Sequence, residues 1–219
     1  MPQGSYAPDT SDPSDYPEEI YGTEVFEINA KLQKRFIAIA SKQKLADSVA
    51  AQAYRSTYGY PPANQPPAVH DCVTATSNNY WSGSRLGDAF SAYTTLFPNG
   101  SGVYCATQQE DNAVLEALLR GDIAKKVDFS RIAIMRTASD FDRAPPNETE
   151  VYHLLCANQA GFDISISNIF IAGYPIVQDV LDNWDTAYAK GISPGNYIGD
   201  TFNSLHKKNA DIGQGQNNQ

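Results

Sequence analysis

The chain has 219 residues, of which 42% are hydrophobic, 19% charged and 11% aromatic, and this is enough to bury the core of one domain. Sixteen basic and 25 acidic side chains give a net charge of −9, and an acidic surface of this size disfavours binding to nucleic-acid phosphates. The mean hydropathy of −0.42 excludes a membrane protein with many spans.

The N-terminal third predicts an irregular start followed by helices. Residues 1–23 contain four prolines among Asp, Ser and Tyr, and they lack the basic and apolar regions of a signal peptide. Over 24–45 apolar residues recur at helical spacing, with basic residues on the opposite side. A shorter helix is expected over 47–58, and the four prolines of 59–67 indicate a surface connection.

The central part predicts strands that alternate with helices. Strands are expected over 69–76, 103–107 and 131–137, and helices are expected over 84–96 and 108–120. This alternation favours an α/β layer fold with a largely buried sheet. Three strands are few for this length, because a typical sheet has about five or six.

The C-terminal part predicts a long amphipathic helix over 163–189, interrupted at residues 173–175 by Gly-Tyr-Pro, and a flexible tail over 206–219. The longest stretch without a charge, 89–109, has the length of a bilayer span, but a Pro-Asn-Gly-Ser-Gly turn lies in its middle. We therefore expect no membrane span in this chain, and its compartment stays open.

Three cysteines are present without the spacing of a zinc site. Cys72 and Cys105 each lie in an apolar, strand-like run, so we expect them to be small buried hydrophobic residues. Sequons at Asn99 and Asn147 permit glycosylation only in a secreted protein. The sequence contains no nucleophile elbow, no P-loop and no dinucleotide-binding glycine motif, and we expect no metal and no cofactor.

The first candidate site follows the expected strand 131–137. Ser139 and Asp140 come at its carboxyl edge, where open α/β sheets place ligands, and Arg136 lies nearby. Asp140 would act there as a general acid or as an anchor for a heterocycle nitrogen. The alternative is that Ser139 or Asp140 caps a helix, and this alternative stays open.

Two further candidates follow the other two strands. Glu110 and Asp111 would hold the two hydroxyls of a ribose, although acidic residues in a first helical turn are also favoured by the helix dipole. In the segment that starts at Asn78, the adjacent rings of Tyr80 and Trp81 would stack on a flat base, or they would cover the core. The residues alone leave both pairs of alternatives open.

Long segments of this sequence resemble the fungal purine nucleoside permeases, and the matching segments cover most of the chain. They include PQGSYAPD (2–9), YGTEVFEINA (21–30), NGSGVYCATQQEDNAVLEALLRG (99–121), VDFSRIAIMRTASDFDR (127–143) and NIFIAGYPIVQDVLDNWDTAYAKGI (168–192). The family name implies nucleoside transport across a membrane. The family is also similar to nucleoside phosphorylases and nucleosidases, which have a three-layer fold with a mixed sheet flanked by helices.

The resemblance implies that residues 24–205 are the C-terminal part of a nucleoside phosphorylase-like domain, with the N-terminal strands missing. Arg136, Ser139 and Asp140 match an R-x-x-S-D motif whose Asp protonates the purine as the glycosidic bond breaks. Asp111, next to Glu110, stands where a ribose-binding Glu is usual, and it has a shorter side chain.

The third motif of the resemblance lines the base pocket. Asn78 stands where an Asp is usual, and it carries no charge. Tyr80 inherits the role of stacking on the base, with Trp81 beside it.

Three functions follow as alternatives. The first is nucleoside binding within a permease-like transporter, with adenosine, inosine or guanosine as the ligand and with homo-oligomers allowed. The second is N-glycosidic cleavage by a phosphorylase or hydrolase, with phosphate as a further ligand of the full-length relative. The third is an inactive truncated fragment. No nucleic-acid partner is expected from the charge.

Overall fold

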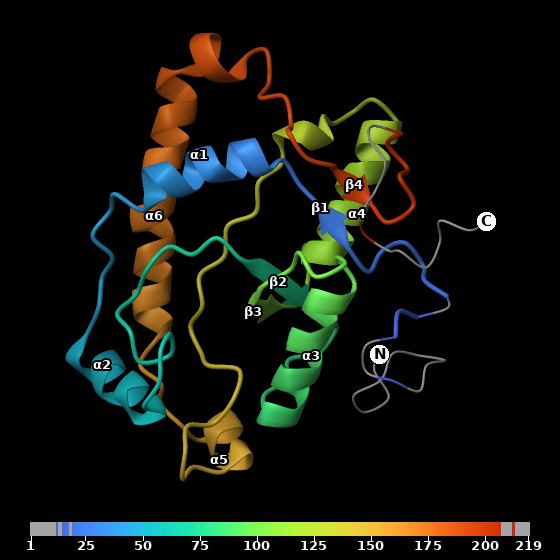
Figure 1. Ribbon diagram of the computed structural model, residues 1–219. Coiled ribbons are helices and arrows are strands. Elements are labelled where there is room, and N and C mark those ends of the chain that lie inside the picture. The colour runs from blue at the N-terminus through green and yellow to red at the C-terminus, as the bar shows by residue number, and fades with distance from the viewer. Residues whose placement is uncertain (1–11, 13–14, 18, 207–211, 213–219) are drawn as a thin grey trace.

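The computed structural model describes residues 12, 15–17, 19–206 and 212 (Figure 1). Most of the expected flexible tail 206–219 and the first part of the expected lead-in 1–23 lie outside these residues. Residues 15–17 and 19–23 form no helix or strand.

The first helix begins at a buried cap. A short strand, β1 (Phe26–Glu27), precedes helix α1 (Ala30–Ala40), which starts later than the predicted residue 24. The reason is Asn29, whose side-chain oxygen accepts hydrogen bonds from the backbone N–H groups of Lys31 and Leu32. The side-chain nitrogen of Asn29 donates to the carbonyls of Ser130 and Ile192, so one buried residue joins three segments.

The predicted strand–helix–strand unit in the centre is confirmed. Strand β2 (Val73–Thr76) and strand β3 (Tyr104–Gln108) pair in parallel, and helix α3 (Ser84–Leu96) connects them. Helix α4 (Asp111–Ile123) follows β3 directly. Helix α2 (Val49–Arg55) and a 3₁₀ turn (Ser56–Tyr58) form the expected helical segment before the proline-rich connection.

The sheet differs from the prediction. Strand β4 (Gly199–Asp200) pairs antiparallel with β1, so the described residues form two separate two-stranded sheets rather than one mixed sheet. The expected strand 131–137 is wrong: these residues contribute to neither sheet. Ile132 and Ile134 pack against the core, which explains the apolar pattern, but within the described part of the chain no strand pairs with their backbone. The coarser prediction of an α/β chain, in which helices are combined with small sheets, is confirmed.

The long helix is confirmed, but its predicted interruption is wrong. Helix α6 (Phe162–Asp182) passes through Pro175 and continues into a π-helical turn (Trp184–Tyr188). Packing against α1 holds it in place: Arg35 forms an ion pair of 2.8 Å with Asp179, and the Asn168 side chain bonds the Ala46 backbone in both directions. A further helix, α5 (Glu150–Leu155), was not predicted.

Helix α6 also changes the expectation about membranes. By length and composition it is a helix that could cross a bilayer, and it is the single such helix in the described part of the chain. It is not an uncharged stretch, because three aspartates lie in it. It contacts α1 through Asp179 and the loop after α1 through Asn168, and these contacts give it a second explanation as a helix of the folded chain.

The core lies between α4 and the β1–β4 pair. Leu115, Leu119, Phe129 and Ile198 form its buried centre, and residues from β1 pack against it. Figure 1 shows α6 and α1 on one side, α3 and α4 on the other, and the extended segment 132–140 running between α6 and the β2–β3 pair.

Candidate functional site

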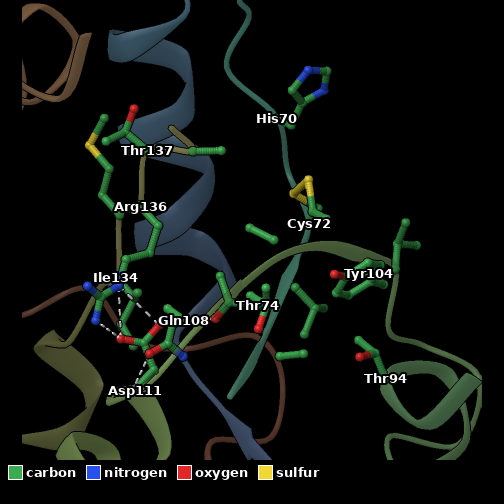
Figure 2. Close-up of a pocket in the computed structure, with 18 of the residues that line it drawn as sticks. His70, Cys72, Thr74, Thr94, Tyr104, Gln108, Asp111, Ile134, Arg136 and Thr137 are labelled. Carbon is green, nitrogen blue, oxygen red and sulfur yellow. Dashed lines mark hydrogen bonds and ion pairs between the residues drawn. A yellow bond between two sulfur atoms is a disulfide. The ribbon is translucent and has the colours of Figure 1, made fainter. Parts of the chain in front are cut away.

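A large cavity lies between the β2–β3 pair, the segment 133–143 and helices α1 and α6 (Figure 2). Its volume is about 2210 Å³, more than the several hundred Å³ that a small-molecule pocket needs. Six of the eight residues predicted for the site line it: Tyr80, Trp81, Asp111, Arg136, Ser139 and Asp140. Asn78 and Glu110 do not line it.

Asp111 and Arg136 form the polar wall of this cavity. Asp111 opens helix α4 and is 3% exposed. The Arg136 guanidinium bonds both of its carboxylate oxygens, with Nε 3.0 Å from Oδ1 and 3.3 Å from Oδ2, and Nη2 also contacts Oδ1. Thr74 Oγ1 on β2 donates to Oδ2 at 3.1 Å. Figure 2 shows these contacts, and the hydrogen bonds to Asp111 raise the pKa of the Arg136 guanidinium.

Glu110 lies beside this pair and is much more accessible. Its side chain is 63% exposed, and its Oε2 is 3.9 Å from Arg136 Nη2. The side-chain oxygen of Gln108 accepts bonds from the backbone N–H groups of Glu110 and Asp111, and so caps the start of α4. Asp111 lies in the first turn of α4, where the helix dipole favours an acidic side chain, and it also lines the cavity.

Tyr80 and Asp140 face the same cavity from two different segments. The Tyr80 ring is 61% exposed. Partial burial and the negative charge of Asp140 both raise the pKa of Tyr80, which places the two groups within electrostatic reach. Ser139 Oγ donates to Asp140 Oδ2 at 2.6 Å, so the serine orients the carboxylate. No helix begins at Ser139 or Asp140, so these residues do not cap one.

Trp81 and Asn78 behave differently from Tyr80. Trp81 is 8% exposed and stacks on Phe90 of α3, with ring centroids 4.6 Å apart, so one of its faces covers the core. The residue lines the cavity, and its buried indole N–H has no hydrogen-bond partner among the described residues. Asn78 is exposed, and its backbone carbonyl accepts a bond from Gln109 at 3.4 Å, which brings the ends of β2 and β3 together.

Three residues that no sequence motif singles out, His153, Gln159 and Gly161, hold the loop that carries Asp140. We call these three residues the clamp below Asp140. His153 Nε2 on α5 donates to the Phe141 carbonyl at 3.0 Å, because a carbonyl can only accept. The Phe141 N–H donates to the Gln159 side chain at 2.7 Å. Gly161 lies so close that an added Cβ would be 2.0 Å from the Ser139 carbonyl oxygen. An isolated His, Gln and Gly carry no recognisable spacing, so no pattern pointed to this clamp.

The other ring nitrogen of His153 faces a second polar group. Tyr54 on α2 bonds Nδ1 through its hydroxyl at 2.8 Å, and Glu148 Oε1 is 3.2 Å from the same hydroxyl. Burial, together with the charge of Glu148, raises the pKa of Tyr54 to about 12. The buried His153 is therefore fixed on both sides, and the loop below Asp140 is attached to α2 through it.

The cysteine prediction is wrong. Cys72 and Cys105 form a disulfide at the edge of the β2–β3 pair, on the wall of the cavity. The parallel register sets Val73 opposite Tyr104, and this brings the neighbouring cysteines within bonding distance, which sequence alone does not reveal. Cys156 is free and exposed. In the described part of the chain, no three His, Cys, Asp or Glu side chains are grouped as metal ligands.

Comparison with known proteins gives one family. The family model for purine nucleoside permease (NUP) matches residues 1–193. A purine nucleoside permease of Candida albicans is 43% identical over 202 residues, covering 91% of this chain and 50% of the relative. A probable purine nucleoside permease of Schizosaccharomyces pombe is 38% identical over 170 residues, covering 77% and 49%. The chain thus spans about half the length of these relatives, and no solved structure matches it.

Proposed function

The chain belongs to the purine nucleoside permease family, and from this premise we propose that it binds a purine nucleoside in the cavity beside β2 and β3, as part of a nucleoside permease-like protein. The observation that carries the proposal is that Tyr80 and Asp140 both line this cavity, although they come from different segments. An exposed aromatic ring and a carboxylate in one cavity suit a flat base that also has hydrogen-bonding ring nitrogens.

The ribose would lie against the wall formed by Asp111 and Arg136. This pair is compensated in charge, which suits an uncharged ligand rather than a phosphate ester. Three donors already occupy the Asp111 carboxylate, which leaves it little capacity for a further hydroxyl. The guanidinium of Arg136, which is 39% exposed and lines the cavity, therefore carries the recognition of the hydroxyls in this proposal.

The proposal includes a nucleoside phosphorylase-like arrangement of the fold. Its support is the parallel β2–β3 pair with α3 as the crossover, and the position of the candidate residues just after the carboxyl ends of both strands. Ligands of open α/β sheets bind at that edge.

A second candidate function is cleavage of the N-glycosidic bond. The observation that favours it is the exposed Asp140 carboxylate, which Ser139 orients and which lines the cavity. Asp140 in its protonated form would give its proton to the departing base, while water or phosphate attacks the anomeric carbon of the sugar. The products would be the free base and ribose, or ribose 1-phosphate when phosphate is the nucleophile.

Titration calorimetry with inosine, adenosine and guanosine tests the proposed binding. Tyr80→Ala and Asp140→Asn should each raise the Kd about tenfold, because a stacked ring and a charged hydrogen bond each contribute roughly 1–3 kcal/mol. Tyr152→Ala and Asp185→Asn are matched controls, since both residues are exposed and lie outside the cavity wall. Failure of the wild-type chain to bind any of the three nucleosides overturns the proposal and leaves the inactive fragment.

The cleavage candidate needs its own measurement. Inosine is incubated with the chain, with and without phosphate, and free hypoxanthine is followed by chromatography. Release that is lost in Asp140→Asn and kept in Asp185→Asn supports cleavage. Nucleoside binding without release of base in either condition leaves binding as the function.

A further inference from the structure

Helix α6 presents a continuous row of large apolar side chains to solvent. We call this row the α6 stripe; it consists of Phe162, Ile166, Phe170, Tyr174, Leu181 and, in the following π-helical turn, Trp184. Each of the six is between 50% and 66% exposed. Their spacing of three, four or seven residues places them on one side of the helix.

The polarity of α6 is the reverse of that of an ordinary surface helix. Its most buried residues are Ser165, Asn168 and Ala172, which face α1 and the cavity, whereas its largest apolar side chains face outward. At 150–250 Å² for each large side chain, the stripe exposes roughly 500–900 Å². One partner in a stable protein interface buries about 800 Å². Apolar patches of this size on soluble chains mark interaction sites.

We propose that the α6 stripe is covered by a polypeptide like the half of the curated relatives that this chain does not match. The matched 202 residues are 50% of the Candida albicans relative, so its unmatched part is about as long as the matched one. A domain of that size has ample surface to cover the stripe. The occupant is thus a folded family-type segment that packs its own apolar face on α6.

A second open surface supports the same occupant. Parallel strands are normally covered on both faces and joined by further strands. The β2–β3 pair has no third strand among the described residues, and Val73 and Val103 at its edge are 38% and 65% exposed. A polypeptide that adds strands and helices would complete both surfaces.

The charges of the chain disfavour the two other occupants. Helices that lie on membranes carry Lys and Arg on their polar face, whereas residues 162–182 contain three Asp and no basic residue. A second copy would bring together the aspartates near the two ends of the stripe, Asp163 at one end and Asp182 and Asp185 at the other. Neither arrangement offers a compensating positive charge.

The test co-expresses the full chain with the unmatched half of the Candida albicans relative as a separate polypeptide. The two should co-purify as a 1:1 complex, and hydroxyl-radical labelling of Phe170, Tyr174 and Trp184 should be at least threefold slower than in the chain alone. Phe170→Asp should abolish co-purification. The control Val49→Asp should not, because Val49 is 84% exposed on α2, away from the stripe.

A chimera covers the case in which the separate half does not fold. In it, this chain replaces the 202 matched residues of the relative, and the buried Phe129 must remain unlabelled as evidence of folding. Protection of the α6 stripe in the folded chimera supports the proposal. Equal labelling of the stripe in the chain alone and in the folded chimera overturns it. Protection of the stripe that appears only when the concentration of the chain alone is raised overturns the proposal in favour of a second copy. Protection that appears only when phosphatidylcholine vesicles are added overturns it in favour of a membrane. None of these readouts requires nucleoside binding.

Discussion

Arg136 bonds both carboxylate oxygens of Asp111, although 25 residues separate them in the sequence. One residue opens helix α4 and the other lies in the extended segment that replaces the predicted third strand. The pair therefore attaches that segment to the end of the parallel sheet, where side chains rather than a ladder of backbone bonds hold it.

The first prediction concerns this pair. Arg136→Ala should lower the free energy of unfolding by about 2–3 kcal/mol, because it leaves the buried Asp111 carboxylate without its cation. Asp111→Asn should lower the free energy of unfolding by less, because Arg136 is 39% exposed and its charge reaches water. The double variant should be less destabilised than the sum of the two, as measured by urea unfolding. Strict additivity of the two losses would contradict a direct coupling.

The second prediction concerns the clamp below Asp140. His153→Leu should lower the free energy of unfolding by about 1–3 kcal/mol, because the Phe141 carbonyl and the Tyr54 hydroxyl both lose a partner. His153→Gln keeps a donor for the carbonyl and should recover part of the loss. Amide hydrogen exchange over 139–142 should accelerate in His153→Leu, and unchanged exchange there would show that the clamp does not order the loop.

The third prediction is a loss of stability at alkaline pH. The pKa of Tyr54 is about 12 in the folded chain and 10.0 ordinarily, so the unfolded chain ionises first. The stabilisation is fully present below pH 10 and is lost as the pH rises toward 12. Tyr54→Phe should flatten the dependence of the unfolding free energy on pH in this window. The control Tyr21→Phe, at a 91% exposed residue, should leave the dependence unchanged.

The fourth prediction concerns the disulfide. Cys72 and Cys105 are 33 residues apart, and closing a loop of this length contributes about 3–4 kcal/mol in the chain-entropy account. Reduction should lower the Tm, and Cys72→Ser combined with Cys105→Ser should do so without reductant. Cys156→Ser should leave the Tm unchanged, since Cys156 is free and exposed. An identical Tm for the oxidised and reduced chain would contradict this stabilisation.

Local sequence patterns sufficed for the elements that depend on local contacts. Helix α3 has the bounds expected from its amphipathic pattern and the turn that follows it. Residues 131–137 have an equally apolar pattern, yet a strand requires a neighbour to bond, and pairing depends on distant residues. The same limit applies to Cys72 and Cys105, which meet only because β2 and β3 pair in parallel.

The same distinction between local patterns and distant contacts applies to the candidate site. Asp140, Tyr80 and Asp111 were predictable because each follows an apolar run at which a strand was expected, and the cavity gathers all three. Their supporting contacts were not predictable. Thr74 and His153 act through distant partners, and nothing in their neighbouring residues indicates those partners.

Asn29 has a consequence for the order of events during synthesis. Its side chain begins α1, yet its donors need the carbonyls of Ser130 and Ile192, and the second of these is encoded 163 codons later. On the ribosome, α1 can form its own turns early but cannot dock at its final place until residue 192 has emerged. Helix α1 is therefore synthesised long before the segment that holds it, and it is locked into the fold only after that segment has emerged.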